Sequence, residues 1–93
     1  MANDAPPADP FPRLVALLLL LEDAQPYVTV EDVCARWEPA SETEACRALV
    51  AEAIADRRLF TDRRQRFDPA TATFHPVRLV RLNRRHPVVA PLV

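Results

Sequence analysis

Residues 41–60 read SETEACRALVAEAIADRRLF, which is the pattern of one amphipathic helix. Ser41 and Glu44 have the spacing of a capping box, in which each side chain binds a backbone N–H at the start of a helix. The apolar residues that follow recur at helical spacing and so share one face: Cys46, Leu49, Val50, Ala53 and Ile54. Arg57 and Arg58 stand in the expected last turn, where the helix dipole favours cations. We therefore predict a helix over residues 41–60.

A shorter helix is expected just before this stretch. Thr29 is a good N-cap residue, and Glu31 and Asp32 would place negative charge in the first turn. The apolar residues of this helix are again helically spaced, at Val30, Val33, Cys34 and Trp37. Pro39 ends the helix, so only a tight turn separates it from the helix at residue 41. Two short amphipathic helices joined in this way predict a helix-turn-helix arrangement.

A third helix is predicted from residue 10 to about residue 24, with Asp9 as its cap and Pro26 as its end. Every residue of the run 14–21 is apolar, so this helix would be apolar on all sides. Either the rest of the domain covers both sides, or one side contacts another subunit. We favour the second, because a small domain has little material to cover two faces. The expected oligomer interface consists of Leu14, Leu17, Leu18 and Leu21.

The pattern after residue 60 is that of a β-hairpin. Residues 64–67 alternate polar and apolar, and residues 68–71 have the composition of a turn. Residues 77–82 fit either a strand or a short helix. We prefer a strand, because a hairpin over residues 59–82 would let Tyr27–Thr29 join it as a third strand. The last segment is apolar and contains prolines, and it must cover either its own core or a partner.

Composition and charge limit the possible classes of protein. The 93 residues suit one small domain, with no glycine and no lysine. The net charge of −1 hides an asymmetry: the chain carries −8 up to Asp56 and +7 from Arg57 onward. This contrast fits a solvated mixed surface, an acidic face that docks on another copy's basic face, or a basic tract for nucleic acid. We expect a tail over residues 1–9, a domain over residues 10–86 and an apolar tail over residues 87–93.

The order of elements resembles the winged helix family over about residues 11–86. The resemblance rests on Tyr27-Val28-Thr29-Val30-Glu31-Asp32-Val33, on the helix at 41–60, on the arginine-rich hairpin and on Leu82-Asn83 with His86-Pro87. It implies a mainly α fold with a small antiparallel β wing, that is, a three-helix winged helix-turn-helix. By this resemblance Ser41–Arg58 is the recognition helix and about Asp62–Thr73 is the wing. Members of the family bind DNA or proteins, so two functions follow from it.

The first function is that of a transcriptional regulator that binds double-stranded DNA, as a homodimer joined through the first helix. Arginines beside the wing tip suit phosphates, and Thr43 and Arg47 lie on the outward face of the recognition helix. The expected nucleic-acid-binding residues are Thr43, Arg47, Arg57, Arg58, Arg63, Arg64 and Arg66. The carboxylates of Glu42, Glu44 and Glu52 oppose this reading. The alternative is a protein–protein interaction module in a larger assembly, with its acidic helical half docked on a basic partner.

Catalysis, metal binding, cofactors and small-molecule ligands are not expected. The spacings of Cys34, Cys46, His75 and His86 match no usual zinc pattern. Ser41 is explained as a helix cap, and the chain has no glycine-rich loop for a phosphate. The chain begins without the positive region of a signal peptide, and the run 14–21 is too short to span a bilayer. We therefore expect a cytoplasmic protein without a membrane segment, with its cysteines as buried free thiols.

Overall fold

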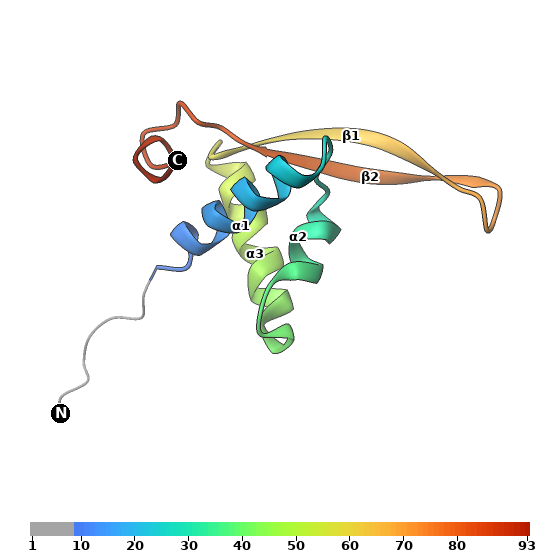
Figure 1. The fold of residues 1–93 in the computed structure, drawn as a ribbon, viewed down its shortest axis with the longest axis horizontal. Coiled ribbons are helices and arrows are strands. Elements are labelled where there is room, and N and C mark those ends of the chain that lie inside the picture. The colour runs from blue at the N-terminus through green and yellow to red at the C-terminus, as the bar shows by residue number, and fades with distance from the viewer. Residues whose placement is uncertain (1–8) are drawn as a thin grey trace.

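The computed structural model describes residues 9–93 (Figure 1). It contains α1 (Phe11–Ala24), α2 (Val30–Arg36), α3 (Thr43–Ala55), β1 (Leu59–Asp68) and β2 (Thr73–Leu82), with short 3₁₀ turns at Ala40–Glu42 and Ala90–Leu92. β1 and β2 form a two-stranded antiparallel sheet, which lies along one side of the three helices and extends past them. The prediction of three helices and an antiparallel hairpin is confirmed. The tail predicted for residues 1–9 lies outside the described residues except for Asp9.

The start of α2 agrees with the sequence pattern. Thr29 is the N-cap, and its hydroxyl oxygen accepts a hydrogen bond from the Asp32 N–H at 3.0 Å. Asp32 Oδ2 accepts the Thr29 N–H, also at 3.0 Å, and the Gln25 amide donates to the same oxygen. Burial of the Asp32 carboxyl raises its pKa, but these hydrogen bonds outweigh that effect and hold the pKa below its usual value. A complete capping box therefore fixes the first turn of α2.

The capping box predicted at Ser41 is wrong. A 3₁₀ turn occupies Ala40–Glu42, and α3 begins only at Thr43, with Glu42 as an N-cap that makes no side-chain hydrogen bond. The Thr43 hydroxyl donates to the Ala40 carbonyl at 2.7 Å instead. The S-x-x-E pattern thus lies partly before the helix, where it cannot bind the N–H groups of the first α-helical turn.

The end of α3 also differs from the prediction. The helix stops at Ala55, so the helix predicted to reach residue 60 ends earlier and the last two residues of that stretch begin β1. Arg57 takes a left-handed conformation with φ of 61°. Its N–H bonds to the Ile54 carbonyl at 3.1 Å, and the Arg58 N–H bonds to the Ala53 carbonyl at 2.9 Å. These two bonds form a Schellman motif, which terminates the helix with arginine in the position that glycine usually occupies.

The core lies between the three helices, the base of the hairpin and the C-terminal segment. Its fully buried members include Phe11, Leu14, Val15, Leu18, Val33, Cys46, Val50 and Val89. The C-terminal segment packs on α1 and buries Val89, so it covers the chain's own core. Cys34 and Cys46 are free buried thiols, and burial together with the neighbouring Cys34 raises the pKa of Cys46 to about 12.

The oligomer interface predicted on α1 needs correction. Leu14, Leu18 and Leu21 are 2% exposed or less and belong to the chain's own core, while Leu17 is partly buried against it. The second side of α1 is covered by the base of the hairpin and by the C-terminal segment, which come from late in the chain. Only Leu20 leaves a large apolar side chain in solvent on this helix. No helix among residues 9–93 has the length and apolar character that crossing a membrane requires.

The predicted third strand is reduced to a single bridge. Thr29 pairs with Leu79, and the Val80 N–H donates to the Val28 carbonyl at 2.9 Å. Further along the same edge of β2, the Leu82 N–H donates to Glu22 Oε2 at 2.9 Å. These contacts attach the base of the hairpin to the helices, whereas the outer part of the hairpin continues without them.

Candidate nucleic-acid interface

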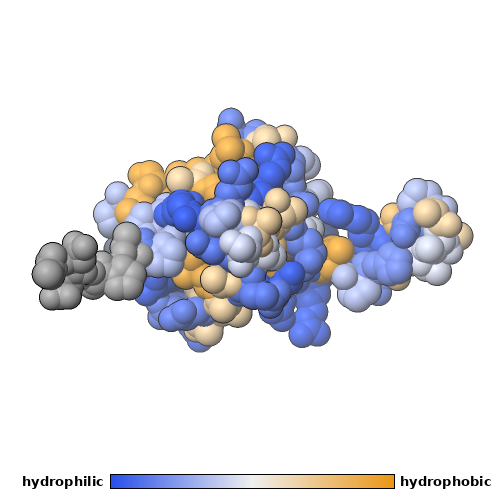
Figure 2. All heavy atoms as spheres, turned by 90° about the horizontal axis from the view of Figure 1, so that it is seen from below, coloured by the Kyte–Doolittle hydropathy of each residue, from blue (hydrophilic) through white to orange (hydrophobic). Residues whose placement is uncertain are grey.

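The two strands of the hairpin place their side chains on two faces in a fixed register. Thr61 lies opposite Val80, Arg63 opposite Arg78, and Phe67 opposite Phe74. Because side chains alternate along a strand, these pairs share the face that enters the core at Leu59 and Leu82. From the body outward, this face carries core residues, then two arginines, then two aromatic rings. Figure 2 shows the end of the hairpin as a lobe that projects from the body of the molecule.

Arg63 and Arg78 form a like-charge pair across the strands. The Val80 N–H points away from β1 and donates to Val28, so Thr61 and Val80 are a non-hydrogen-bonded pair. Hydrogen-bonded and non-hydrogen-bonded pairs alternate along the strands, so Arg63 and Arg78, two residues further, are also a non-hydrogen-bonded pair. The Cβ atoms of directly opposite residues lie roughly 4.5–5.5 Å apart, and like charges there destabilise the hairpin. Both arginines are exposed, and neither has a carboxylate within 4.0 Å in the described part of the chain. An anion bound between the two guanidinium groups would remove this repulsion.

The other face of the hairpin carries Arg64 and Arg66. Arg64 Nε lies 3.0 Å from Asp62 Oδ2, and this hydrogen bond lowers the pKa of the Asp62 carboxyl. Asp62 Oδ1 also accepts the Arg63 N–H at 2.8 Å, on the outer edge of β1. Arg66 is exposed and makes no ion pair with the residues described. Of the three wing arginines predicted from sequence, Arg63 and Arg66 are therefore available to a ligand and Arg64 is already paired.

The tip of the hairpin carries two exposed aromatic rings. The centroids of Phe67 and Phe74 lie 5.2 Å apart in an edge-to-face arrangement, and the two residues are 50% and 63% exposed. Beside them, on the opposite face, the Asp68 carboxylate accepts the Ala70 N–H at 2.9 Å and lies 3.5 Å from the His75 ring. The turn brings the strands close enough for the two rings to touch while they remain half in solvent.

The polar groups predicted on α3 are occupied by the chain itself. Arg47 NH1 bonds to Glu31 at 3.0 Å, and its Nε lies 3.6 Å from Glu44. The hydrogen bond to Glu31 raises the pKa of Arg47. Both Arg47 and Thr43 lie in the first half of α3, whose N-terminal end points away from the hairpin (Figure 1). The structure therefore does not join them with the hairpin arginines into one surface.

Arg57 and Arg58 lie at the base of the hairpin. Arg58 pairs with Asp56 at 2.6 Å, and its guanidinium carbon lies 4.7 Å from the centroid of the Phe11 ring. The positive charge of Arg58 is therefore already paired within the helical part of the molecule. Arg57 is exposed, and its carbonyl accepts the Asn83 side-chain amide at 2.8 Å. Arg57 can contribute charge at the base, but it lies far along the strands from the tip.

Arg78 is the important residue that the sequence prediction omitted. The turn at residues 69–72 places Arg63 directly opposite Arg78. The prediction preferred a strand over residues 77–82 but placed the turn at residues 68–71, and counting outward from that turn sets Arg63 opposite Pro76. A tight antiparallel hairpin fixes which residues face one another, so a shift of one residue in the turn was enough to miss the pair.

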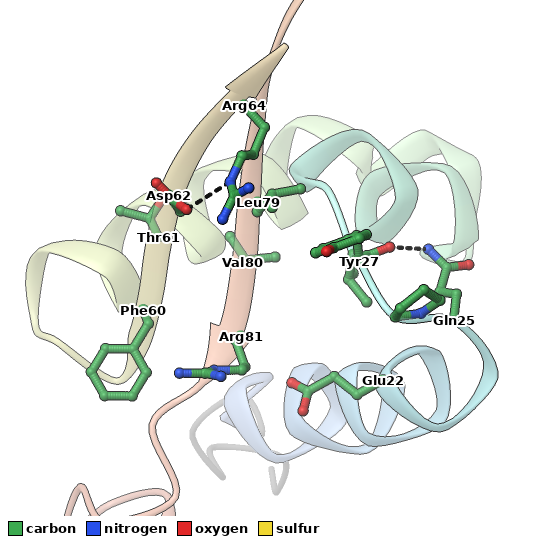
Figure 3. A pocket seen from close by; sticks show the side chains of 12 residues that line it. Glu22, Gln25, Tyr27, Phe60, Thr61, Asp62, Arg64, Leu79, Val80 and Arg81 are labelled. Carbon is green, nitrogen blue, oxygen red and sulfur yellow. Dashed lines mark hydrogen bonds and ion pairs between the residues drawn. The ribbon is translucent and has the colours of Figure 1, made fainter. Parts of the chain in front are cut away.

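A shallow cleft lies on the face of the sheet that carries Arg64, between the hairpin, the end of α1 and residues 25–28 (Figure 3). It has a volume of about 570 Å³, and Tyr27 and Phe60 lie on opposite sides of it. Its charged groups already have partners: Arg64 pairs with Asp62, Glu22 binds the Leu82 N–H, and Arg81 packs 5.5 Å from the Phe60 ring centroid. The cleft therefore presents no free acid, base or nucleophile arranged for catalysis.

Metal ligands do not gather anywhere in the part of the chain that is described, since no group of three or more His, Cys, Asp or Glu side chains could hold an ion. The chain matches no family model, no curated protein and no solved structure. The features from which a function can be inferred are therefore the cationic face of the hairpin, its aromatic tip and the acidic surface of the helices.

Proposed function

We propose that the protein is a winged helix domain that binds double-stranded DNA through its hairpin and acts as a small cytoplasmic regulator of transcription. The observation that carries this proposal is the Arg63–Arg78 pair, two uncompensated guanidinium groups on an exposed hairpin. Such a pair costs stability in the free protein and gains a partner when a phosphate binds, because guanidinium matches phosphate by bidentate hydrogen bonding. Arg66 adds a third cation on the other side of the same hairpin.

In this proposal α3 contributes little to reading bases. Arg47 is held by two carboxylates, and Glu44 and Glu52 on the same helix would repel phosphates. Affinity then comes mostly from phosphate contacts, which are independent of sequence and sensitive to salt. The proposed site lies on one copy of the chain, since the leucines predicted to join two copies are buried in its own core.

The test is the salt dependence of binding to a fluorescent duplex of about 20 base pairs, measured by anisotropy. The logarithm of the affinity should fall linearly with the logarithm of the salt concentration, with a slope of about 0.9 for each phosphate neutralised. Replacing both Arg63→Ala and Arg78→Ala should reduce that slope by about 1 to 2 and weaken binding to all sequences alike. Arg47→Ala is the matched control, because it removes the same charge from a group that the chain already occupies. It should change the affinity less than about twofold.

A second function is favoured by the helices rather than by the hairpin. Around Arg47 the carboxylates outnumber the cation, because Glu31 and Glu44 both pair with this one arginine. Such a surface suits a basic protein partner, so the alternative proposal is a protein-interaction module. Absence of duplex binding at low salt would contradict the DNA proposal. Loss of a co-purifying basic partner on changing Glu31→Ala together with Glu44→Ala would then support the alternative.

A further inference from the structure

We infer that the Phe67–Phe74 pair is an apolar wedge that enters the minor groove of a duplex and separates a deformable base step. This inference rests on the proposed function, because it assigns a role to the hairpin tip of a protein that binds DNA. A protein with such a wedge would select duplexes by how easily a base step unstacks, and it would not select a particular base sequence.

The position and exposure of the two rings support the wedge. They are the most distal aromatic side chains of the hairpin, and both remain at least half exposed although they touch each other. An edge-to-face pair stabilises a hairpin wherever it lies along the strands. Placing the pair at the free end, away from the core, leaves apolar surface in water that a partner could cover. Apolar wedges of this kind are inserted between base steps from the minor groove by proteins that kink DNA.

The charges along the same face fit a nucleic acid as the occupant. Arg63 lies four residues before Phe67 and Arg78 lies four residues after Phe74, which is about 13 Å of extended chain and about four base pairs of B-DNA. On this face, the residues between the arginines and the rings are Gln65 and Pro76, which carry no charge. The arginines could therefore hold backbone phosphates while the rings enter the groove beside them. The Asp68 carboxylate is on the opposite face and is engaged by the Ala70 N–H.

The expected selectivity follows from the energy of unstacking. Separating a base step costs a few kcal/mol in a stiff duplex and less at a flexible or mismatched step. A wedge therefore binds better where the duplex is already weak, without any contact to base edges. This agrees with an α3 surface whose arginine is held by Glu31 and Glu44.

The experiment compares two fluorescent duplexes of equal length, one with a stiff A-tract and one with a single central mismatch. The unmodified protein should bind the mismatched duplex about tenfold more tightly, and 2-aminopurine beside the mismatch should brighten as it unstacks. The double variant Phe67→Ala with Phe74→Ala should lose this preference, with its affinity for the A-tract duplex changed less than about twofold. Leu20→Ala is the matched control, because it removes a similarly exposed apolar side chain, 61% exposed, from α1.

The possible outcomes separate the wedge from the proposed function. If the unmodified protein binds both duplexes equally, with a salt dependence that requires Arg63 and Arg78, the wedge is wrong and the DNA function stands. If neither duplex is bound at low salt, both proposals fail. If the Phe67→Leu and Phe74→Leu variant keeps the mismatch preference while the alanine variant loses it at unchanged helical circular dichroism, the apolar volume at the tip is responsible and the wedge is supported.

Discussion

At the level of single residues, Thr29 joins α2 to the hairpin. Its side chain is 2% exposed, it caps α2 through Asp32, and it pairs with Leu79 of β2. The hydrogen bonds that lower the pKa of Asp32 stabilise the fold above about pH 4, the ordinary pKa of a free carboxyl, and this contribution is lost as the pH falls through the lowered value. The cap therefore couples the start of a helix to the base of the hairpin.

Substituting this cap should be costly, and the chain contains its own control. Thr29→Ala should lower the free energy of unfolding by about 1–2 kcal/mol, because a buried N-cap and its capping box are lost. Ser41→Ala should change it by less than about 0.5 kcal/mol, because Ser41 caps no helix. Urea denaturation followed by circular dichroism measures both values. Equal losses from the two variants would show that Ser41 caps α3 in solution.

The contrast between Thr29 and Ser41 shows what a local pattern can predict. Both residues precede a carboxylate by three positions, and the sequence cannot tell which of them starts an α-helix. The same holds at the other end of α3, where a chain without glycine gives no signal for the left-handed residue at Arg57. Helix existence was predictable from the apolar spacing, whereas the boundaries depended on turns that only the folded chain reveals.

At the level of elements, α1 and the hairpin depend on each other. Residues 14–21 of α1 are all apolar, and the residues that cover the second side of this helix come from the hairpin base and the C-terminal segment. The apolar run in the sequence identified this helix, but it did not identify the residues that pack on its second side. Those residues, which include Leu82 and Val89, lie about sixty positions further along the chain. That is why the predicted oligomer interface turned out to be core.

The hairpin itself should divide into a firm base and a looser outer part. Near the body its strands contribute Leu59, Val80 and Leu82 to the core, whereas the residues from Arg63 to Arg78 are exposed or half-buried. Backbone amides of that outer part should exchange with deuterium well before those of α1, because few buried contacts oppose local opening there. Hydrogen-exchange mass spectrometry of the intact chain tests this. Equally slow exchange throughout the hairpin would mean that something else covers its outer part.

At the level of the whole molecule, the C-terminal segment closes the core. Val89 is fully buried although it lies only four residues from the end of the described chain, while Val93 is 46% exposed. Val89→Ala should lower the free energy of unfolding by about 2 kcal/mol, since two buried methyl groups are removed. Val93→Ala should leave it almost unchanged. Thermal unfolding monitored by circular dichroism compares the two, and matching midpoints would contradict the packing of this segment.

The charge asymmetry of the sequence corresponds only in part to the distribution of unpaired charge in the folded molecule. The sequence predicted that arginines gather on the hairpin, and Arg63 and Arg66 are indeed exposed there. It could not predict that Arg47 is neutralised, because Glu31 lies on a different helix and meets it only after α2 packs on α3. Nor did it assign Arg78, which requires the strand register. The sequence determines how many charged residues the chain has, whereas the fold determines which of them remain unpaired and can contact a ligand.

The outer edges of the hairpin have a consequence for how the protein behaves at high concentration. A long ribbon with open backbone groups is a template on which other chains can add strands and grow into fibrils. On the edge of β1, the Arg63 N–H already donates a hydrogen bond to the side chain of its neighbour Asp62. On the edge of β2, Pro76 has no backbone N–H that could donate. These two positions interrupt the row of free backbone donors along each edge, which should slow the addition of strands between crowded copies of this protein.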